Sequence, residues 1–195
     1  MEHVHHGKSS EGFLDTDLIL EELNFRGCET FMDAGCGDGH FAVRAAEKYL
    51  SDGNAYAVDV YDESIEKLND YKNKNSLENL KPVEADIAEG ILEIDDASVD
   101  VILMVNVIHG FKQSDKISDV VFELKRLIKD DGRIAVVEFK PVEMSFGPAM
   151  DIRFSWHELK ELFCGSGFKM TYLNVELGVD VAEGKSHYMI IFEKE

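Results

Sequence analysis

The chain alternates between short apolar runs and longer segments in which apolar residues recur at helical spacing. Continuous apolar runs are typical of strands buried on both faces of a parallel sheet, and the recurring pattern is typical of helices packed on one face. Strands are predicted for residues 30–34, 55–58, 81–85, 99–105, 133–139, 168–177 and 187–192. Helices are predicted for residues 15–25, 41–50, 114–128 and 156–164, with a further helix that Asp62 caps. This alternation indicates an α/β domain.

Residues 141–154 form a long connection without a predicted element, and they display Met144, Phe146, Met150 and Phe154. Long connections in compact domains are often functional, so this apolar segment is interpreted as a lid over a substrate site. The same side chains would serve equally well to cover the core, and the pattern leaves both interpretations open.

Three glycines at alternate positions, Gly35, Gly37 and Gly39, separate the first predicted strand from the helix that follows. Glycine accepts positive φ and lets a ligand approach the backbone, while the helix start offers free N–H groups and a positive dipole end. The turn therefore predicts a ligand cradle, although glycines at these positions would also make a tight turn alone. Asp33 and the G-x-G-x-G spelling depart from the dinucleotide fingerprint, because a carboxylate repels a pyrophosphate but pairs with a cationic amino group.

Carboxylates also follow the next two predicted strands. Asp59 ends the second strand, where a carboxylate can accept hydrogen bonds from both hydroxyls of a ribose. Asp86 ends the third strand and, with Ile87, could frame an adenine. The alternatives are that Asp59 caps the following helix and that Asp86 is a loop residue without a ligand.

Asn106 and His109 follow the fourth predicted strand. In an open α/β sheet the ligand crevice lies beyond the carboxyl ends of the strands, so both residues are expected beside a bound cofactor. His109 is the catalytic candidate, because imidazole exchanges protons near neutral pH. A structural histidine at a strand–helix junction is the alternative.

Taken together, residues 33–39, 58–60 and 84–87 resemble the first three motifs of class I S-adenosylmethionine-dependent methyltransferases, more narrowly the type 11 group that includes ubiquinone and menaquinone biosynthesis enzymes. The resemblance runs from about residue 15 to the end of the chain. It implies a Rossmann-like three-layer sandwich, with a seven-stranded, mostly parallel sheet whose last strand is antiparallel. It also implies S-adenosyl-L-methionine as cofactor and S-adenosyl-L-homocysteine as product. The implied cofactor-binding residues are Asp33, Gly35, Cys36, Gly37, Gly39, Asp59, Val60, Asp86, Ile87 and Asn106.

The net charge of the chain limits the classes of molecule that it can bind. Thirty-nine acidic and 20 basic side chains give a formal net charge of −19, whereas a nucleic-acid-binding protein needs a basic face. A small-molecule methyl acceptor is therefore expected, and no nucleic acid. The absence of a long apolar run predicts no membrane insertion and a cytoplasmic protein. An odd number of scattered cysteines argues against disulfides.

Residues 1–14 are predicted to be a flexible segment and a candidate lid, followed by a single methyltransferase domain at 15–195. The histidines at positions 3, 5 and 6 could bind a transition metal, but no metal site is predicted.

The predicted reaction is direct SN2 transfer of a methyl group to the small-molecule acceptor. A non-catalytic S-adenosylmethionine-binding sensor or partner-activating subunit is the first alternative. An NAD(P)-dependent oxidoreductase is disfavoured by the glycine spelling, and methylation of a thiol or metalloid is disfavoured by the scatter of the cysteines. The pattern predicts neither the methylated atom nor the oligomeric state.

Overall fold

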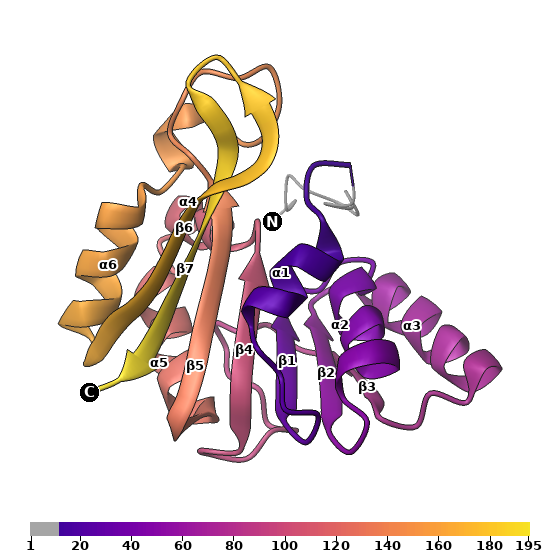
Figure 1. The fold of residues 1–195 in the computed structure, drawn as a ribbon. Coiled ribbons are helices and arrows are strands. Elements are labelled where there is room, and N and C mark those ends of the chain that lie inside the picture. Colours follow the sequence, from indigo (N-terminus) through magenta and orange to yellow (C-terminus); the bar gives the residue numbers. More distant parts are fainter. Residues whose placement is uncertain (1–11) are drawn as a thin grey trace.

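A single seven-stranded sheet organises the protein, for which a computed structural model describes residues 12–195 (Figure 1). The strand order is β3-β2-β1-β4-β5-β7-β6. The strands are β1 (Thr30–Ala34), β2 (Asn54–Asp59), β3 (Leu80–Glu84), β4 (Val99–Val105), β5 (Ile128–Phe139), β6 (Phe168–Val181) and β7 (Gly184–Lys194). The helices are α1 (Thr16–Glu22), α2 (His40–Arg44), α3 (Asp62–Asn75), α4 (Ile108–Gln113), α5 (Ile117–Leu127) and α6 (Trp156–Gly165), with a π-helix η1 (Ala45–Tyr49) and a 3-10 turn η2 (Met150–Ile152).

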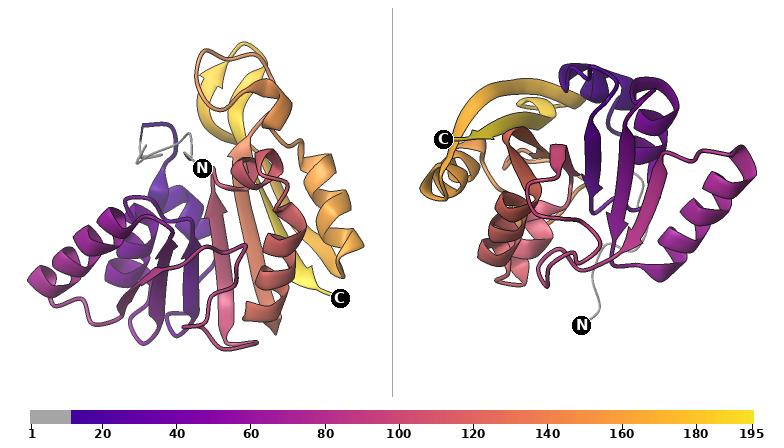
Figure 2. Two further views of the ribbon diagram at one scale, coloured as in Figure 1. Left: turned by 180° about the vertical axis from the view of Figure 1, so that it is seen from behind. Right: turned by 90° about the horizontal axis from the view of Figure 1, so that it is seen from below.

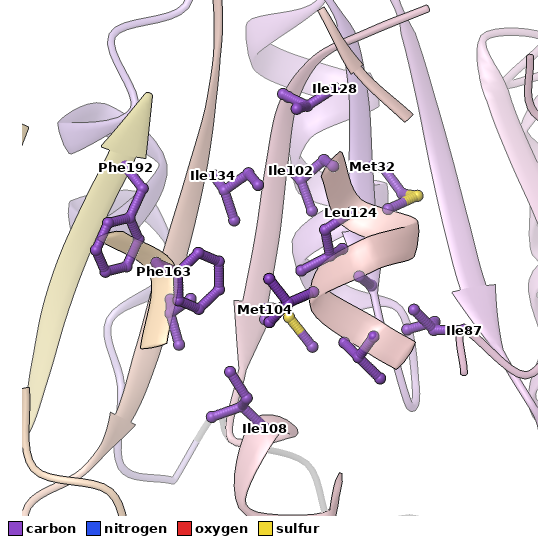
Figure 3. Packing of buried hydrophobic residues seen from close by; sticks show 14 of the residues in the cluster. Met32, Ile87, Ile102, Met104, Ile108, Leu124, Ile128, Ile134, Phe163 and Phe192 are labelled. Atoms are coloured by element: carbon purple, nitrogen blue, oxygen red, sulfur yellow. The ribbon is translucent and has the colours of Figure 1, made fainter. Parts of the chain in front are cut away.

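Helices cover both faces of this sheet, which makes three layers (Figure 2). Apolar side chains from α1, α2 and α3 pack in one buried cluster, and those from α4, α5 and α6 pack in a second cluster on the opposite face. In the second cluster Leu124 of α5 packs with Met32 and Ile102 of the central strands (Figure 3). Burying each such side chain contributes about 1.5–3 kcal/mol, so both faces stabilise the domain.

The strand directions confirm the expected sheet. β1 pairs in parallel with β2 and β4, and β5 continues the parallel set beside β4. β7 is antiparallel to both β5 and β6, which confirms the antiparallel last strand. The carboxyl ends of β1, β2, β4 and β5 therefore meet at one edge of the sheet, named here the carboxyl edge. The far half of the β6–β7 hairpin and the segment before α6 rise above this edge (Figure 1).

Several element boundaries differ from the predictions. The predicted helix at 41–50 is α2 followed by η1, because the Leu50 N–H bonds the Ala45 carbonyl 3.0 Å away and the Asn79 side-chain amide occupies the Ala46 carbonyl. Asp62 is the first residue of α3 rather than its cap, which is Tyr61.

The predicted helix at 114–128 was also wrong at its start. The structure has a separate helix α4 ahead of α5, and Asp115, at φ 58°, adopts a left-handed conformation that separates the two. Strands β5, β6 and β7 are longer than predicted, so residues 178–186, which separate the last two predicted strands, are mostly strand.

The N-terminal histidines and most of the N-terminal segment predicted as a candidate lid lie outside the described residues. Of the segment 1–14, the structure describes residues 12–14. Leu14 is buried with the α1 side of the core, and the Phe13 ring stacks on Phe146 with the ring centroids 4.8 Å apart. The proposed boundary at residue 15 remains a prediction.

Candidate active site

The three glycines of the turn after β1 all have positive φ, but they differ in their surroundings. A Cβ atom at Gly35 would lie 2.7 Å from the Val107 side chain, and one at Gly39 would lie 2.4 Å from Leu68. A Cβ atom at Gly37 would meet nothing within 4 Å. Close packing therefore requires glycine at the outer two positions, while Gly37 presents bare backbone to open space.

Asp59 joins the glycine turn to the end of β2. Its Oδ2 atom accepts the Gly37 N–H at 2.7 Å, and its Oδ1 atom accepts the Tyr61 N–H at 3.1 Å. It does not cap α3, whose N-cap Tyr61 has no side-chain cap bond. A carboxylate has about four acceptor positions, so two remain for ligand hydroxyls.

Asp33 lies beneath the turn and is almost fully buried. Its Oδ2 atom accepts the Ala42 N–H at 3.2 Å. Burial is the main cause that raises the pKa of Asp33 to about 7, against a partial offset from His40. A carboxylate held at this pKa gains from any cation placed beside it, which suits a ligand with an ammonium group.

Asn106 follows β4 and has a φ of 57°, which an asparagine tolerates better than most residues. Its N–H donates to the Val137 carbonyl at 2.9 Å, and the next residue, Val107, packs against Gly35. Its Oδ1 atom is buried and accepts no hydrogen bond from residues 12–195. An acceptor without a donor beside the glycine turn fits a ligand that brings N–H groups.

The other residues predicted to bind the cofactor differ from these in burial and in their partners. The Oδ2 atom of Asp86 lies 3.3 Å from Lys116 Nζ, a partner that sequence reasoning missed because it lies just before the distant helix α5. Val60 is exposed beside Asp59. Ile87 belongs to the buried core (Figure 3). Cys36 is also buried, its N–H is bonded to a β2 carbonyl, and burial raises the pKa of its thiol, so its side chain is a packing group.

His109 and Glu138 form a second polar pair, at the carboxyl ends of β4 and β5. The Nδ1 atom of His109 lies 2.8 Å from Glu138 Oε2, and the Phe139 N–H donates to Glu138 Oε1 at 2.8 Å. Both side chains are buried. Because a carboxylate only accepts, Nδ1 carries the proton and Nε2 is the basic nitrogen. Sequence reasoning did not pair Glu138 with His109; the available signal was an acidic residue inside an apolar strand.

A sequence model of the family described as "Methyltransferase domain" matches residues 27–165. The chain belongs to this methyltransferase family.

Solved structures support the same fold for this methyltransferase. A SAM-dependent methyltransferase from Aquifex aeolicus is 23% identical, with a TM-score of 0.80, over 95% of this chain and 93% of that one. A protein described as a type 11 methyltransferase, from Sulfolobus solfataricus, is 23% identical with a TM-score of 0.68, over 93% of each chain. The [4+2]-cyclase SpnF is 16% identical with a TM-score of 0.73, over 98% of this chain and 87% of that one. The resemblance to class I methyltransferases is thus confirmed at the level of family and fold, and the fold alone does not fix the reaction.

Arg153 organises residues 141–154 of the methyltransferase, the second predicted lid, named here the lid loop. This buried guanidinium donates hydrogen bonds to backbone carbonyls of the segment around it. The acceptors are the carbonyls of Lys140 at 3.3 Å, Val142 at 2.6 Å, Phe146 at 3.1 Å and Pro148 at 2.9 Å. The segment is therefore a folded loop held by one side chain.

The apolar side chains of this loop divide between the two interpretations. Phe154 is buried in the core, as the covering interpretation expects. Phe146 instead stacks on Phe13, and its ring centroid lies 6.2 Å from that of Phe139. Met150 is exposed. A hollow of about 310 Å³ is lined by residues 143–150 and Arg153.

The described residues contain neither a candidate metal-binding cluster nor a candidate membrane-spanning helix. Within residues 12–195, no three His, Cys, Asp or Glu side chains gather closely enough to hold a metal ion. None of the helices in the same range has the length and apolar character that crossing a bilayer demands.

Proposed function

We propose that the protein transfers a methyl group from S-adenosylmethionine to a small-molecule acceptor by direct in-line displacement and releases S-adenosylhomocysteine. One observation carries the proposal: a methyltransferase-family chain holds Asp59 on Gly37, next to a buried Asp33 and an Asn106 oxygen that has no donor among residues 12–195. Each of these groups accepts hydrogen bonds or positive charge, and the glycine backbone beside them is bare. This arrangement matches a cationic, hydroxyl-rich nucleoside.

The chain's residues divide the cofactor between them. Asp33 and Asn106 would hold the ammonium end, and Asp59 would hold the ribose hydroxyls. Asp86 and Val60 would contact the adenine, with Ile87 and Cys36 packing behind. When bound, the cofactor supplies a methyl group activated on a sulfonium. Placement of donor and acceptor in line can contribute about 7–11 kcal/mol to lowering the barrier.

His109 is the proposed general base, and Glu138 is its positioning residue. The 2.8 Å contact fixes the proton on Nδ1 and turns the basic Nε2 away from the carboxylate. Nε2 would take the proton that the acceptor atom loses when it is methylated. A base of this kind contributes roughly 10²–10⁴-fold to the rate where the acceptor carries a proton.

The acceptor is proposed to be a small molecule, because a net charge of −19 opposes binding to polyanions. We also propose a cytoplasmic location. A second candidate function is cofactor binding without methyl transfer, which the similarity to a [4+2]-cyclase keeps open.

The experiment that tests the proposal is formation of S-adenosylhomocysteine from S-adenosylmethionine in the presence of fractionated small-molecule extracts. We expect acceptor-dependent product with the wild type and with the control Asp70→Ala, an exposed acidic residue of α3. We expect none with Asp59→Ala, provided that its thermal unfolding is unchanged. Cofactor binding without product from any fraction would favour the second candidate.

A further inference from the structure

His187 lies at the carboxyl edge, on β7 directly opposite Phe139 of β5. Its ring centroid is 4.1 Å from that of Phe139, at an interplanar angle of 41°. Phe139 in turn neighbours Phe146 of the lid loop, which stacks on Phe13. These four rings, named here the aromatic group, connect the hairpin, the lid loop and the start of the described chain. They offer flat apolar surfaces close to the proposed acceptor side.

One polar atom of this group has no partner among the residues that the structure describes. His187 is fully buried, and its Nε2 atom makes no hydrogen bond within residues 12–195. On the other side of the ring, Nδ1 lies 2.7 Å from Ser186 Oγ, which accepts the Val179 N–H. The serine hydroxyl can then donate its own proton to Nδ1, and we assign the imidazole proton to Nε2 on this basis. A buried donor that has no acceptor in the described part of the chain is therefore present beside Phe139.

The charges that reach His187 are positive. Burial, followed by the charges of Arg153 and Lys140, lowers the pKa of His187 to about 3, so the ring is neutral at physiological pH. Arg153 donates its hydrogen bonds to backbone carbonyls. The charges of Glu143 and Glu138 also act on Arg153, but neither carboxylate forms an ion pair with it within the described part of the chain.

We propose that His187, Lys140 and Arg153 form a subsite for an anionic oxygen of the methyl acceptor, and that the acceptor is a flat molecule carrying a carboxylate or a similar anion. This proposal rests on the proposed function and specifies its substrate class. His187 Nε2–H donates the hydrogen bond, while the two cations act through their charge. Phe139 and Phe146 contact the flat frame.

Benzoate and benzamide provide a matched pair of probes, because they share a planar frame and differ in charge. Each is titrated into the full-length protein by calorimetry, with and without saturating S-adenosylhomocysteine. We expect benzoate to bind at least about tenfold more tightly than benzamide in at least one of the two conditions. Equal affinity of the two probes, or no binding of benzoate in either condition, would overturn the subsite.

Variants separate the subsite from the fold. His187→Phe keeps the ring contact with Phe139 and removes the donor, and Lys140→Gln removes a charge; each should weaken benzoate binding by about tenfold or more. His187→Gln, which retains an N–H donor, should recover part of the loss. The control is Lys185→Gln on the same hairpin, where Lys185 already pairs with Asp180. Unchanged benzoate affinity in His187→Phe would contradict the proposal.

The two proposals fail in different ways. S-adenosylhomocysteine should bind wild type, His187→Phe and Lys140→Gln alike, because none of the changed groups belongs to the glycine turn. Loss of that binding in the wild type would count against the proposed function. The comparison of benzoate with benzamide in the absence of S-adenosylhomocysteine would still decide the subsite.

Discussion

At the scale of single residues, burial sets the behaviour of Asp33. The side chain lies under the glycine turn with one backbone donor, and the effect of burial outweighs the favourable charge of His40. The unfolded chain loses the Asp33 proton near pH 3.8, whereas the folded chain loses it near pH 7. The contribution of Asp33 to stability is therefore full at low pH and is lost as the pH rises towards 7 and beyond. Without a bound cation, the site therefore carries the free-energy cost of an ionised, buried Asp33 at neutral and higher pH.

Asp33→Asn should raise the free energy of unfolding at pH 8 and weaken cofactor binding. The gain follows because an amide has no charge to bury, whereas the wild-type carboxyl must ionise in the folded chain at a cost of about 4 kcal/mol. Urea unfolding at pH 5 and pH 8 measures it: the difference between the variant and the wild type should grow with pH. A variant that is less stable than the wild type at pH 8 would contradict this explanation.

Binding of S-adenosylmethionine should release a proton from Asp33 below pH 7, because the ammonium favours the ionised carboxylate. The affinity should rise between pH 5.5 and 7.5 and then level off. Calorimetry in two buffers of different ionisation enthalpy measures the released protons directly. Asp33→Asn is the control, since it has no proton to release, and an equally pH-dependent residual affinity in that variant would assign the effect to another group.

At the scale of elements, short segments place the chemistry. The short helix α4 carries His109 to the end of β5, where the apolar strand includes Glu138. The lid loop is shaped by one arginine and its carbonyl partners, without a regular element of its own beyond η2. The His109–Glu138 pair joins residues that are distant in sequence. The hydrophobic pattern predicts neither this pair nor the hydrogen bonds that shape the lid loop.

Glu138→Gln should lower kcat by about 10–100-fold and leave cofactor affinity unchanged. Glutamine still accepts the Phe139 N–H, but it stabilises the protonated imidazole less than a carboxylate does. Steady-state kinetics give kcat, and calorimetric titration with S-adenosylhomocysteine gives the cofactor affinity, with the exposed Glu161→Gln as the control. An unchanged kcat, or equal losses in kcat and cofactor affinity, would argue that Glu138 is only structural.

Arg153→Lys should loosen the lid loop. Lysine has three donors on one nitrogen and cannot reach four carbonyls arranged around a planar guanidinium. We expect faster proteolysis within residues 141–152 and a loss of about 1–3 kcal/mol in the free energy of unfolding. The exposed Lys160→Arg serves as the control. An unchanged cleavage rate would mean that core packing of Phe154 holds the loop instead.

At the scale of the whole molecule, the sequence predicted the layers and the glycine turn better than the pairings between distant groups. β1 and β4 match their predicted bounds because continuous apolar runs mark strands buried on both faces. The far half of the β6–β7 hairpin was missed because it rises beyond the core, where its residues are partly exposed and lose a clear period. Lys116 beside Asp86, Glu138 beside His109 and the buried His187 are contacts made by folding, and no local spacing marks them.

The measurement that tests the central claim most directly is calorimetric titration of the wild-type protein with S-adenosylmethionine, S-adenosylhomocysteine and NADH. We predict dissociation constants of about 1–100 μM for both sulfur compounds, equivalent to roughly 5–8 kcal/mol of binding free energy, and no binding of NADH. Binding of NADH without either sulfur compound would contradict the cofactor assignment and with it the proposed methyl transfer.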